Sequence, residues 1–353
     1  MKKLFLILPA LVLFACQPSQ SPSGLKDSAS FPVGTAIRPN QLTNDSSMQA
    51  IVNKDFNSIT LENSMKMYAV HSSENEYNWE HVDEVVNYTQ QNNLRLHGHA
   101  FIWHAGTPDW IHEMEPDSAM LDKIMEEYIL TYGKRYKGKV AGWDVVNEAV
   151  LDSSGDFRES IWYETMGEAY IARAFELAHK ADPDAVLFYN DFNIERDTVK
   201  LHATLRMIEK LKDQNVPISG LGFQMHIRMD TDEETIEYAL KKAAETGLQI
   251  HLSEIDIIFN KHDDTPGGGV QVHDELTEEM LQAQAEKYQW LAEAYVRNVP
   301  SDQRYGMTVW GFSDKYSWIP SFFDIDDWPC IYDSEMNPKP AYYGFMKGLE
   351  TSK

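Results

Sequence analysis

Short apolar runs, rich in β-branched and aromatic residues, alternate along the chain with longer stretches in which apolar side chains recur every three to four positions. The first pattern predicts buried strands and the second predicts amphipathic helices. Eight strands are predicted, at Val33–Ile37, Ser58–Glu62, Arg95–Trp103, Gly142–Asn147, Val186–Asn190, Gly220–His226, Ile250–Ile255 and Met307–Phe312. The clearest helical patterns are at Ile124–Tyr136, Trp162–Lys180, Val199–Asp213, Thr235–Glu245 and Glu278–Val299.

Strand–helix alternation that is repeated eight times indicates parallel strands joined by helical crossovers, and eight such units close a barrel. A doubly wound sheet would alternate in the same way, but no glycine-rich phosphate turn follows an early strand. We therefore predict an α/β fold, a single (β/α)8 TIM barrel over residues 31–350. In such barrels the active site lies at the carboxyl ends of the strands, so polar residues there are candidates for chemistry.

Residues 1–16 have the pattern of an export signal. Two lysines precede an apolar run over residues 4–14, which is too short to span a bilayer as a permanent helix. The run ends at Cys16, and residues 13–16 resemble a bacterial lipobox, whose cysteine is lipidated. Residues 17–30, rich in Ser and Pro, are predicted to form a flexible tether. We predict an exported protein, lipid-anchored to the periplasmic or cell-surface face of the outer membrane, or secreted if the segment is an ordinary signal peptide.

The balance of charged residues limits the kinds of partner that the protein is expected to bind. The chain has 353 residues, with 31 Lys and Arg against 55 Asp and Glu, a net charge of −24 at pH 7. This excess argues against nucleic acid and against electrostatic docking on anionic lipid, and it favours a neutral small molecule or polymer. If Cys16 carries lipid, Cys330 is the one remaining cysteine of the sequence, so no disulfide is predicted within the mature chain.

Two carboxylates end strands that would face each other across the mouth of the barrel. The predicted fourth strand is followed by Glu148, and the seventh contains Glu254. A pair of carboxyl groups at such a place can carry out glycoside hydrolysis, in which one carboxyl group is protonated and the other is ionised. The alternative is a solvated pair of carboxylates on the rim.

The neighbours of the two carboxylates favour the hydrolytic interpretation. Asp256 lies two residues after Glu254, on the same face of its strand, and His226 ends the adjacent strand. A chain from Asp256 through His226 would orient the Glu254 carboxylate and keep it ionised. Across the mouth, Trp310 and Trp318 would form an apolar wall that raises the pKa of Glu148. Asn147 and Glu148 can both reach a substrate if their strand ends or bulges there.

The remaining strand ends carry the groups that bind sugars, which offer hydroxyl edges and apolar C–H faces. These residues are Glu62, Asn63, Lys66, His99, Trp103, His104, Asn190, Asp191, Asn193 and Gln224. Three of the nine tryptophans fall at strand ends and are assigned to the cleft: Trp103, Trp310 and Trp318. Three others fall at mid-strand or helical positions and are assigned to the core: Trp143, Trp162 and Trp290.

Taken together, these segments resemble glycoside hydrolase family 10, the retaining endo-β-1,4-xylanases, over nearly all of residues 31–349. The matching stretches occur in the same order along the chain: TLENSMK (60–66), GHAFIWH (98–104), WDVVNEAV (143–150), FYNDFNIE (188–195), GLGFQMHI (220–227), LSEIDI (252–257), VWGFSDKYSWI (309–319) and PKPAYYG (338–344).

The resemblance implies that Glu148 is the general acid/base and Glu254 the nucleophile that forms a covalent glycosyl-enzyme, with Asp256 in support. It further implies which residues bind sugars on the non-reducing side of the cut: Glu62, Asn63, Lys66, His99, Trp103, Asn147, Gln224, His226, Trp310 and Trp318. Retention requires the two carboxyl groups about 5–5.5 Å apart. The sequence departs from the family at Ala105-Gly106, where many members carry Ser-Gln and the Gln contacts a sugar.

Three alternatives remain at the level of sequence. His97 and His99 on one face of a strand, with His226 and Asp314, could belong to a metal-dependent hydrolase barrel. A surface lipoprotein could bind glycans without cleaving them. The same chemistry could act on another β-1,4 polymer such as cellulose. We predict a monomer that acts on xylan and xylo-oligosaccharides, with no metal, cofactor, nucleic acid or membrane contact apart from the lipid anchor.

Overall fold

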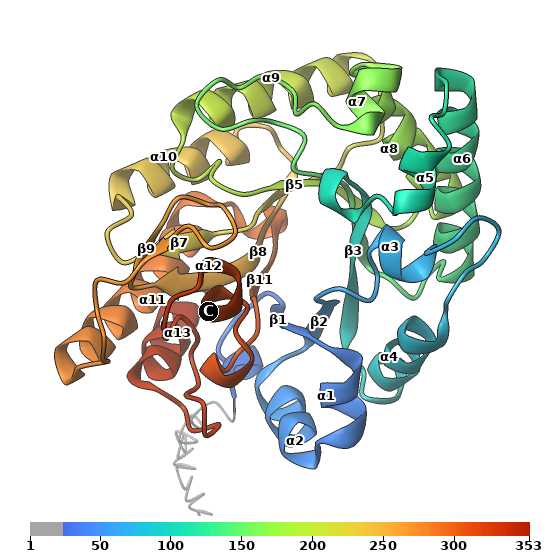
Figure 1. The fold of residues 1–353 in the computed structure, drawn as a ribbon. Helices are drawn as coiled ribbons and strands as arrows, with labels where there is room; N and C mark the ends of the chain where they lie inside the picture. The colour runs from blue at the N-terminus through green and yellow to red at the C-terminus, as the bar shows by residue number, and fades with distance from the viewer. Residues whose placement is uncertain (1–23) are drawn as a thin grey trace, which may run out of the picture.

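The computed structural model describes residues 24–353, so the predicted signal segment and Cys16 lie outside the described residues. Eight parallel strands close a barrel, and helices surround it (Figure 1). The barrel strands are β1 (Val33–Ile37), β2 (Ser58–Leu61), β3 (Arg95–Trp103), β4 (Gly142–Asn147), β5 (Val186–Asp191), β6 (Gly220–Phe223), β8 (Gln249–Ile258) and β11 (Arg304–Val309). They pair in this order, and β11 pairs with both β8 and β1, which confirms the predicted TIM barrel.

The predicted sixth strand is divided in two. Strand β6 ends at Phe223, and β7 (His226–Arg228) begins after Gln224 and Met225 and pairs with the outer part of β8. Met225 has a left-handed backbone with φ of 63°, which a regular strand does not contain. The prediction of one continuous strand over 220–226 was therefore wrong. The bend lets Gln224 and His226 belong to separate segments at the mouth of the barrel.

Helices fill the connections between strands. The helices are α1 (Pro39–Asn44), α2 (Ser46–Asp55), α3 (Met67–Val70), α4 (Glu80–Gln91), α5 (Asp109–Glu113), α6 (Ser118–Arg135), α7 (Ile161–Met166), α8 (Ala169–Ala181), α9 (Thr198–Asp213), α10 (Glu233–Ala244), α11 (Glu278–Asn298), α12 (Ile319–Phe323) and α13 (Pro340–Glu350). The predicted helix over 162–180 is interrupted at Gly167, whose φ of 62° ends α7. A small hairpin of β9 (Lys261–His262) and β10 (Gly269–Val270) extends the loop after β8.

The core lies inside the barrel and between the strands and the helices. Trp143 and Trp162 are almost fully buried and Trp290 is partly buried against the core, as predicted. A side chain at Gly98 would overlap the indole of Trp143 on the neighbouring strand, so a glycine is required there. Among residues 24–353, no helix is long and apolar enough to cross a membrane.

The folded domain begins earlier than the sequence predicted. Leu25 is fully buried, and its N–H donates to the buried Asp55 carboxylate at 3.2 Å. The N–H of Ser30 donates to Ser352 at 2.9 Å. Residues 24–30 therefore pack beside the ends of α2 and α13, and the predicted tether over 17–30 does not extend through them. This segment lies at the amino ends of β1 and β2, opposite the end of the barrel where polar residues follow the strands.

Candidate active site

The carboxyl ends of the strands surround a cleft of about 500 Å³. The cleft contains most of the residues that the sequence singled out: Glu62, Asn63, Lys66, His99, Trp103, Glu148, Gln224, His226, Glu254, Trp310 and Trp318. Asn147 and Asp256 lie directly behind this lining and hydrogen-bond to it. The barrel thus brings the predicted catalytic and sugar-binding residues to one place, with one exception. Asp191 was predicted to bind sugar, but it is fully buried behind the cleft, where it pairs with Lys200.

Glu148 is the first residue after β4. Its backbone is left-handed, with φ of 59°, and its N–H donates to the carbonyl of Asn190 at 2.9 Å. The strand therefore ends where the sequence required it to end, and Asn147 and Glu148 both face the site. The Asn147 amide donates to the Glu148 carboxylate at 3.0 Å. A left-handed backbone at a non-glycine residue is strained, and such residues cluster at functional sites.

The Glu148 carboxylate accepts further hydrogen bonds from Trp103 Nε1 at 2.8 Å and from Gln224 Nε2 at 2.9 Å. Burial raises the pKa of Glu148, but the charge of His104, these two hydrogen bonds and the charge of Lys200 together lower it below its ordinary value.

The prediction that an apolar wall of Trp310 and Trp318 raises the pKa of Glu148 was therefore wrong. Donor groups from Trp103 and Gln224, rather than those two indole faces, touch the carboxylate. Trp318 instead donates through Nε1 to Asp256 at 3.0 Å.

Glu254 lies on β8 and is 4% exposed. Its Oε1 accepts from Asn190 Nδ2 at 2.8 Å, and the same amide nitrogen donates to Asn147 Oδ1 at 2.8 Å. Because Asn147 also donates to Glu148, two amide side chains connect the carboxylates. This connection fixes the orientation of one carboxylate relative to the other.

His226 joins Glu254 to Asp256. Its Nδ1 lies 2.9 Å from Asp256 Oδ2, and its Nε2 lies 3.5 Å from Glu254 Oε2. Burial lowers the pKa of His226, but the charge and hydrogen bond of Asp256, together with those of Glu254, raise it to about 10. The imidazole is therefore protonated at neutral pH and can donate to both carboxylates. The predicted chain of Asp256, His226 and Glu254 is present.

Polar groups gather at the opposite end of the cleft, after β2. The Glu62 carboxylate accepts two hydrogen bonds from Arg38, at 2.7 and 3.0 Å. Lys66 donates to Asn63 at 3.1 Å, and its ammonium lies 4.6 Å from the centre of the Trp103 ring. Burial lowers the pKa of the Lys66 ammonium, although the neighbouring carboxylates oppose this effect. These groups can hydrogen-bond to hydroxyls beside an exposed ring face.

Comparison with known proteins agrees with this arrangement. The family model described as glycosyl hydrolase family 10 matches residues 24–348. The chain belongs to glycosyl hydrolase family 10. It is 39% identical to endo-1,4-beta-xylanase B of Thermotoga neapolitana over 85% of this chain and 82% of that protein.

Two Cellvibrio japonicus proteins are also similar. The chain is 34% identical to endo-1,4-beta-xylanase A over 93% of its own length, but it spans only 56% of that longer protein. A mutant of xylanase 10C, solved in complex with xylopentaose, superposes with a TM-score of 0.87 at 33% identity, over 94% of this chain and 70% of that one. This chain is therefore a glycoside hydrolase of family 10 with the family fold.

Membership of family 10 also argues against the alternative that His97 and His99 belong to a metal-dependent hydrolase barrel. His97 Nε2 and His99 Nδ1 lie 3.0 and 2.8 Å from the two oxygens of the buried Asp144 carboxylate, so both rings flank one carboxylate inside the barrel. Within residues 24–353, no group of three or more His, Cys, Asp or Glu side chains is arranged to hold a metal ion.

Several residues that line the cleft were not predicted from the sequence. Arg158, Phe192, Asp264 and Pro266 lie on loops that follow strands, and His262 ends the short strand β9. The Arg158 Nε donates to the Glu148 carbonyl at 3.0 Å. In the sequence, the one indication that these residues line the cleft is their position after predicted strands. This indication is weak because no periodicity distinguishes a cleft loop from a surface loop. The sequence departs from many family members at Ala105-Gly106. There, Ala105 lines the cleft and Gly106 lies against the ring of Trp103.

Proposed function

We propose that this family 10 protein is a retaining endo-1,4-β-xylanase that cleaves internal β-1,4-xylosidic bonds of xylan. The observation that carries the proposal is the pair Glu148 and Glu254, joined by the Asn147 and Asn190 amides at the mouth of the barrel. The relatives that are named xylanases, and the neighbour that binds xylopentaose, support the choice of polymer.

The two carboxylates take different roles in the proposed double displacement. Glu254, beside the protonated His226, attacks the anomeric carbon while Glu148 protonates the departing glycosidic oxygen. Glu148 then removes a proton from water, and that water hydrolyses the covalent intermediate and restores Glu254. The reaction needs no metal ion, so we expect full activity after exhaustive chelation; loss of activity would favour a metal-dependent hydrolase.

Product analysis tests the activity itself. Purified protein is expected to release a ladder of oligosaccharides from glucuronoxylan and arabinoxylan, and retained anomeric configuration should be visible by proton NMR. Glu254→Gln should abolish turnover on every substrate because no covalent intermediate can form. A protein that binds these polymers but releases no reducing sugar would be a glycan-binding module instead.

The acid role has a separate test. Glu148→Ala should reduce hydrolysis of xylan far more than hydrolysis of an aryl xylobioside, whose leaving group needs little protonation. Equal losses on the two substrates would contradict the assignment of Glu148 as the acid.

The second candidate polymer is a β-1,4-glucan. Glucose differs from xylose by a hydroxymethyl group, which the rings of Trp310 and Trp318 would have to exclude. Trp318 is fixed by Asp256 and lies edge-on to His226, with ring centroids 5.0 Å apart, so this wall is supported from behind. Discrimination by fit alone amounts to about 1–3 kcal/mol. The ratio of activities on xylan and carboxymethyl-cellulose decides between the polymers.

We also propose, on the sequence of the first sixteen residues, that the protein is exported as a lipoprotein on Cys16 and acts as a monomer. The lipobox-like stretch and the Ser- and Pro-rich residues after it support this localisation. Mass spectrometry of the amino-terminal peptide should find a diacylglyceryl cysteine, and Cys16→Ser should move the enzyme out of the membrane fraction. An unmodified, secreted product would indicate an ordinary signal peptide.

A further inference from the structure

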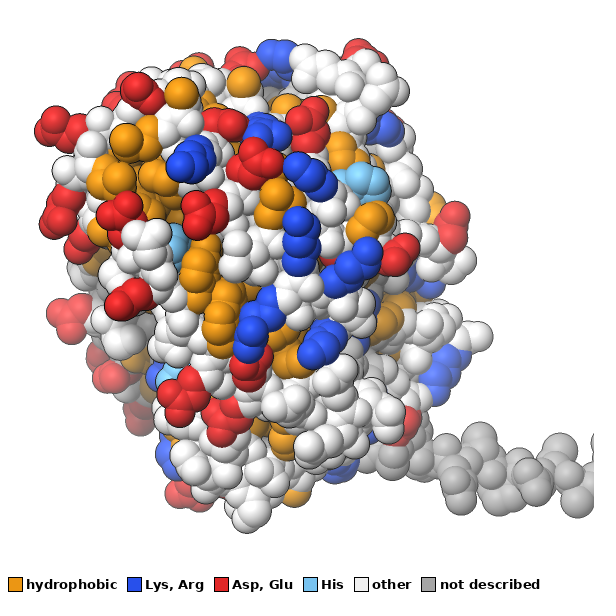
Figure 2. All heavy atoms as spheres, turned by 90° about the vertical axis from the view of Figure 1, so that its right-hand side faces the viewer, with side chains coloured by type: hydrophobic (Ala, Val, Ile, Leu, Met, Phe, Trp, Pro, Cys, Tyr) orange, Lys and Arg blue, Asp and Glu red, His pale blue; other side chains and the backbone are white. Residues whose placement is uncertain are grey.

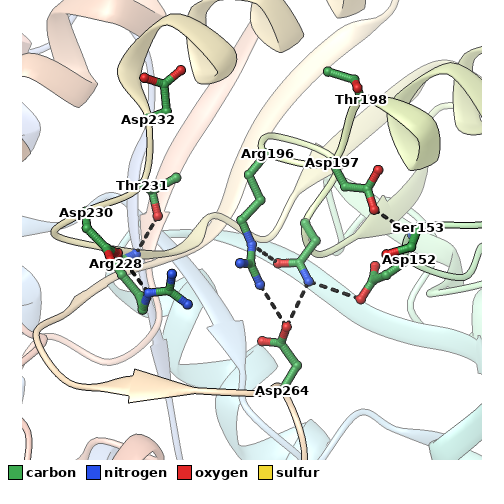
Figure 3. Close-up of a pocket in the computed structure, with 11 residues that line it drawn as sticks. Asp152, Ser153, Arg196, Asp197, Thr198, Arg228, Asp230, Thr231, Asp232 and Asp264 are labelled. Carbon is green, nitrogen blue, oxygen red and sulfur yellow. Dashed lines mark hydrogen bonds and ion pairs between the residues drawn. The ribbon is translucent and has the colours of Figure 1, made fainter.

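One hollow of the surface adjoins the catalytic cleft and continues it. Asn193 and Asp264 line both spaces. Its charged groups are paired with one another, as Figure 3 shows for Arg196 and Asp264, which lie 2.8 Å apart. Arg228 donates to Asp230 at 2.9 Å in the same way. This hollow belongs to the site already described, whereas a separate groove lies on the outside of the barrel.

The outer groove lies between helices α11 and α13, which pack side by side (Figure 1). It has a volume of about 520 Å³, and we define it by Gln282 and Gln289 of α11 and by Pro340, Tyr343 and Lys347 of α13. None of these five residues lines the catalytic cleft. The loops after β8 and β11 lead into the two helices, so both helices start at the carboxyl ends of the strands. The groove therefore begins at the end of the barrel that carries the cleft.

The floor of the outer groove consists of small residues. Gly344 of α13 lies against Ala285 of α11, and a Cβ atom on Gly344 would come within 2.1 Å of the Ala285 carbonyl oxygen. The two helix backbones therefore approach closely, and the longer side chains on either side stand above a shallow floor. A flat ligand can lie between these two rows of side chains.

Tyr343 presents an aromatic ring beside this floor. It is 59% exposed, more than any other large hydrophobic side chain of residues 24–353. Its ring lies 5.2 Å from the ring of the buried Tyr342, at an angle of 84°, and Tyr342 donates a hydrogen bond to the buried Asp55 at 2.7 Å. Tyr343 thus has a fixed neighbour on one side and solvent on the other. An exposed ring of this kind can stack on the apolar C–H face of a sugar.

The polar side chains of the outer groove have hydrogen-bonding capacity left. Gln282 Nε2 donates to Glu286 at 2.9 Å, which leaves its carbonyl oxygen as an acceptor. Gln289 Nε2 donates to Glu293 at 2.7 Å with the same result. Lys347 has no ion-pair or hydrogen-bond partner within residues 24–353, so its ammonium is available as a donor.

The charge of the outer groove indicates what kind of ligand it suits. Glu286 and Lys347 are its two charged lining residues, so the lining is neutral overall on a chain of net charge −24. A neutral lining attracts neither an anion nor a metal ion. Amide acceptors and an ammonium donor around an exposed ring match the hydroxyl groups and the apolar face of a neutral polysaccharide.

We propose that the outer groove binds a second segment of xylan, away from the active site, with one xylose ring stacked on Tyr343. The identity of the sugar rests on the proposed function, because xylan is the polymer that the enzyme acts on there. A chain held in the groove keeps the polymer beside the protein and raises the local concentration of bonds that can enter the cleft. Oligosaccharides too short to occupy both sites gain nothing from it.

Binding is tested in the Glu254→Gln variant, in which the polymer stays uncleaved. Native electrophoresis through gels that contain soluble xylan measures the affinity. Adding Tyr343→Ala should weaken binding about tenfold, the effect of losing one aromatic anchor, whereas Tyr343→Phe keeps the ring and should stay within about twofold. The matched control is Tyr238→Ala, because Tyr238 is 38% exposed on α10 and lines neither the cleft nor the outer groove.

Activity is tested with both catalytic carboxylates in place. Tyr343→Ala should lower the initial rate on insoluble xylan about threefold or more, while kcat/KM on xylohexaose stays within about twofold. Thermal unfolding checks that the variants fold. Unchanged binding and unchanged rates on insoluble xylan would overturn the inference, and so would equal losses on xylohexaose and on the polymer.

Light scattering tests the other occupant of such a groove, a second copy of the chain. A dimer that Tyr343→Ala dissociates would overturn the inference, because the groove would then be an interface between copies. A wild-type protein that hydrolyses no xylan would instead refute the proposed function. The binding comparison in Glu254→Gln needs no hydrolysis, so the two failures can be told apart.

Discussion

At the scale of single residues, the site depends on hydrogen-bond donors aimed at two carboxylates. Glu148 accepts from three side chains, and Glu254 accepts from Asn190 while it lies beside the protonated His226. Donors stabilise the ionised form of a carboxyl group. The pH range of activity should therefore respond to individual donors, and two substitutions test this.

Replacing His226 should move the acidic limb of the pH profile. The pKa of His226 is raised to about 10, so its positive charge is present throughout the working range. His226→Ala removes that charge from beside Glu254, and the carboxylate is then protonated more readily as the pH falls. We expect the acidic limb of kcat/KM to shift to higher pH. His202→Ala, on the exposed surface of α9, is the matched control. An unmoved limb would count against the support by Asp256 and His226.

Replacing Trp103 should move the opposite limb. Trp103→Phe keeps an aromatic ring but removes the Nε1 donor that helps to lower the pKa of Glu148. The pKa of the acid should rise, so Glu148 keeps its proton to higher pH. We expect the basic limb of kcat/KM to move upward, measured on xylohexaose across pH 4–9. A basic limb that stays in place, or moves downward, would show that this hydrogen bond does not control the acid.

At the scale of elements, β5 supports the segment that carries the acid. Tyr189 Oη accepts the N–H groups of Ala149 and Val150, at 3.1 and 3.2 Å, and it donates to the buried Asp191. Asp191 in turn contacts the fully buried Lys200 of α9 at 2.8 Å. The residues directly after Glu148 are thus held from behind by a strand and a helix.

Tyr189→Phe tests this support. The substitution leaves two backbone N–H groups buried without their acceptor, at a cost of roughly 1–3 kcal/mol in the free energy of unfolding. We expect kcat on xylan to fall as well, because the backbone that fixes Glu148 loosens, and KM to change less. Urea denaturation and steady-state kinetics measure the two effects. A loss of stability without any change in kcat would mean that β5 supports the fold alone.

Most of the barrel strands and the main helices could be predicted from the sequence. Runs of β-branched and aromatic residues indicate buried strands, so the positions of Glu148 directly after β4 and of Glu254 on β8 could be predicted. The break between β6 and β7 could not, because it depends on the left-handed backbone at Met225 and leaves the hydrophobic pattern unchanged. The pKa of Glu148 was predicted in the wrong direction for a related reason. Which side chains reach a carboxylate is decided by tertiary placement, not by neighbours in sequence.

At the scale of the whole molecule, acidic side chains outnumber basic ones and give a net charge of −24. Figure 2 shows Lys and Arg side chains gathered on the side of the barrel that carries α6, interspersed with acidic ones. Several of these charges are paired, as between Arg135 and Asp83 at 2.5 Å, and between Arg173 of α8 and both Asp122 and Glu126. Exposed pairs contribute about 0–1 kcal/mol each, so the core supplies most of the stability.

One buried acid should make the stability of the whole domain depend on pH. Both Glu195 oxygens are buried without a hydrogen-bond partner, and burial raises the pKa of Glu195 to about 7. The folded state therefore binds this proton more tightly than the unfolded chain does, and the free energy of unfolding falls as the pH rises from about 4.5 to about 7.

Glu195→Gln removes the ionisation. We expect it to stabilise the protein above pH 7 by up to about 3 kcal/mol and to have little effect at pH 4. Thermal unfolding at the two pH values measures the difference, with Glu176→Gln on the exposed face of α8 as the control. A variant equally stabilised or destabilised at both pH values would show that Glu195 is not titrating.

The first described residues pack against α2 and α13 at the amino ends of the strands, and Ser30 contacts Ser352 near the end of the chain. Any material coupled to the protein ahead of Gly24, whether a lipid, a fusion partner or a resin, is consequently attached at the amino ends of the strands. The catalytic cleft lies at the other end of the barrel. Such an immobilised enzyme would present its open groove outward, and a long hemicellulose strand could lie across it without meeting the support.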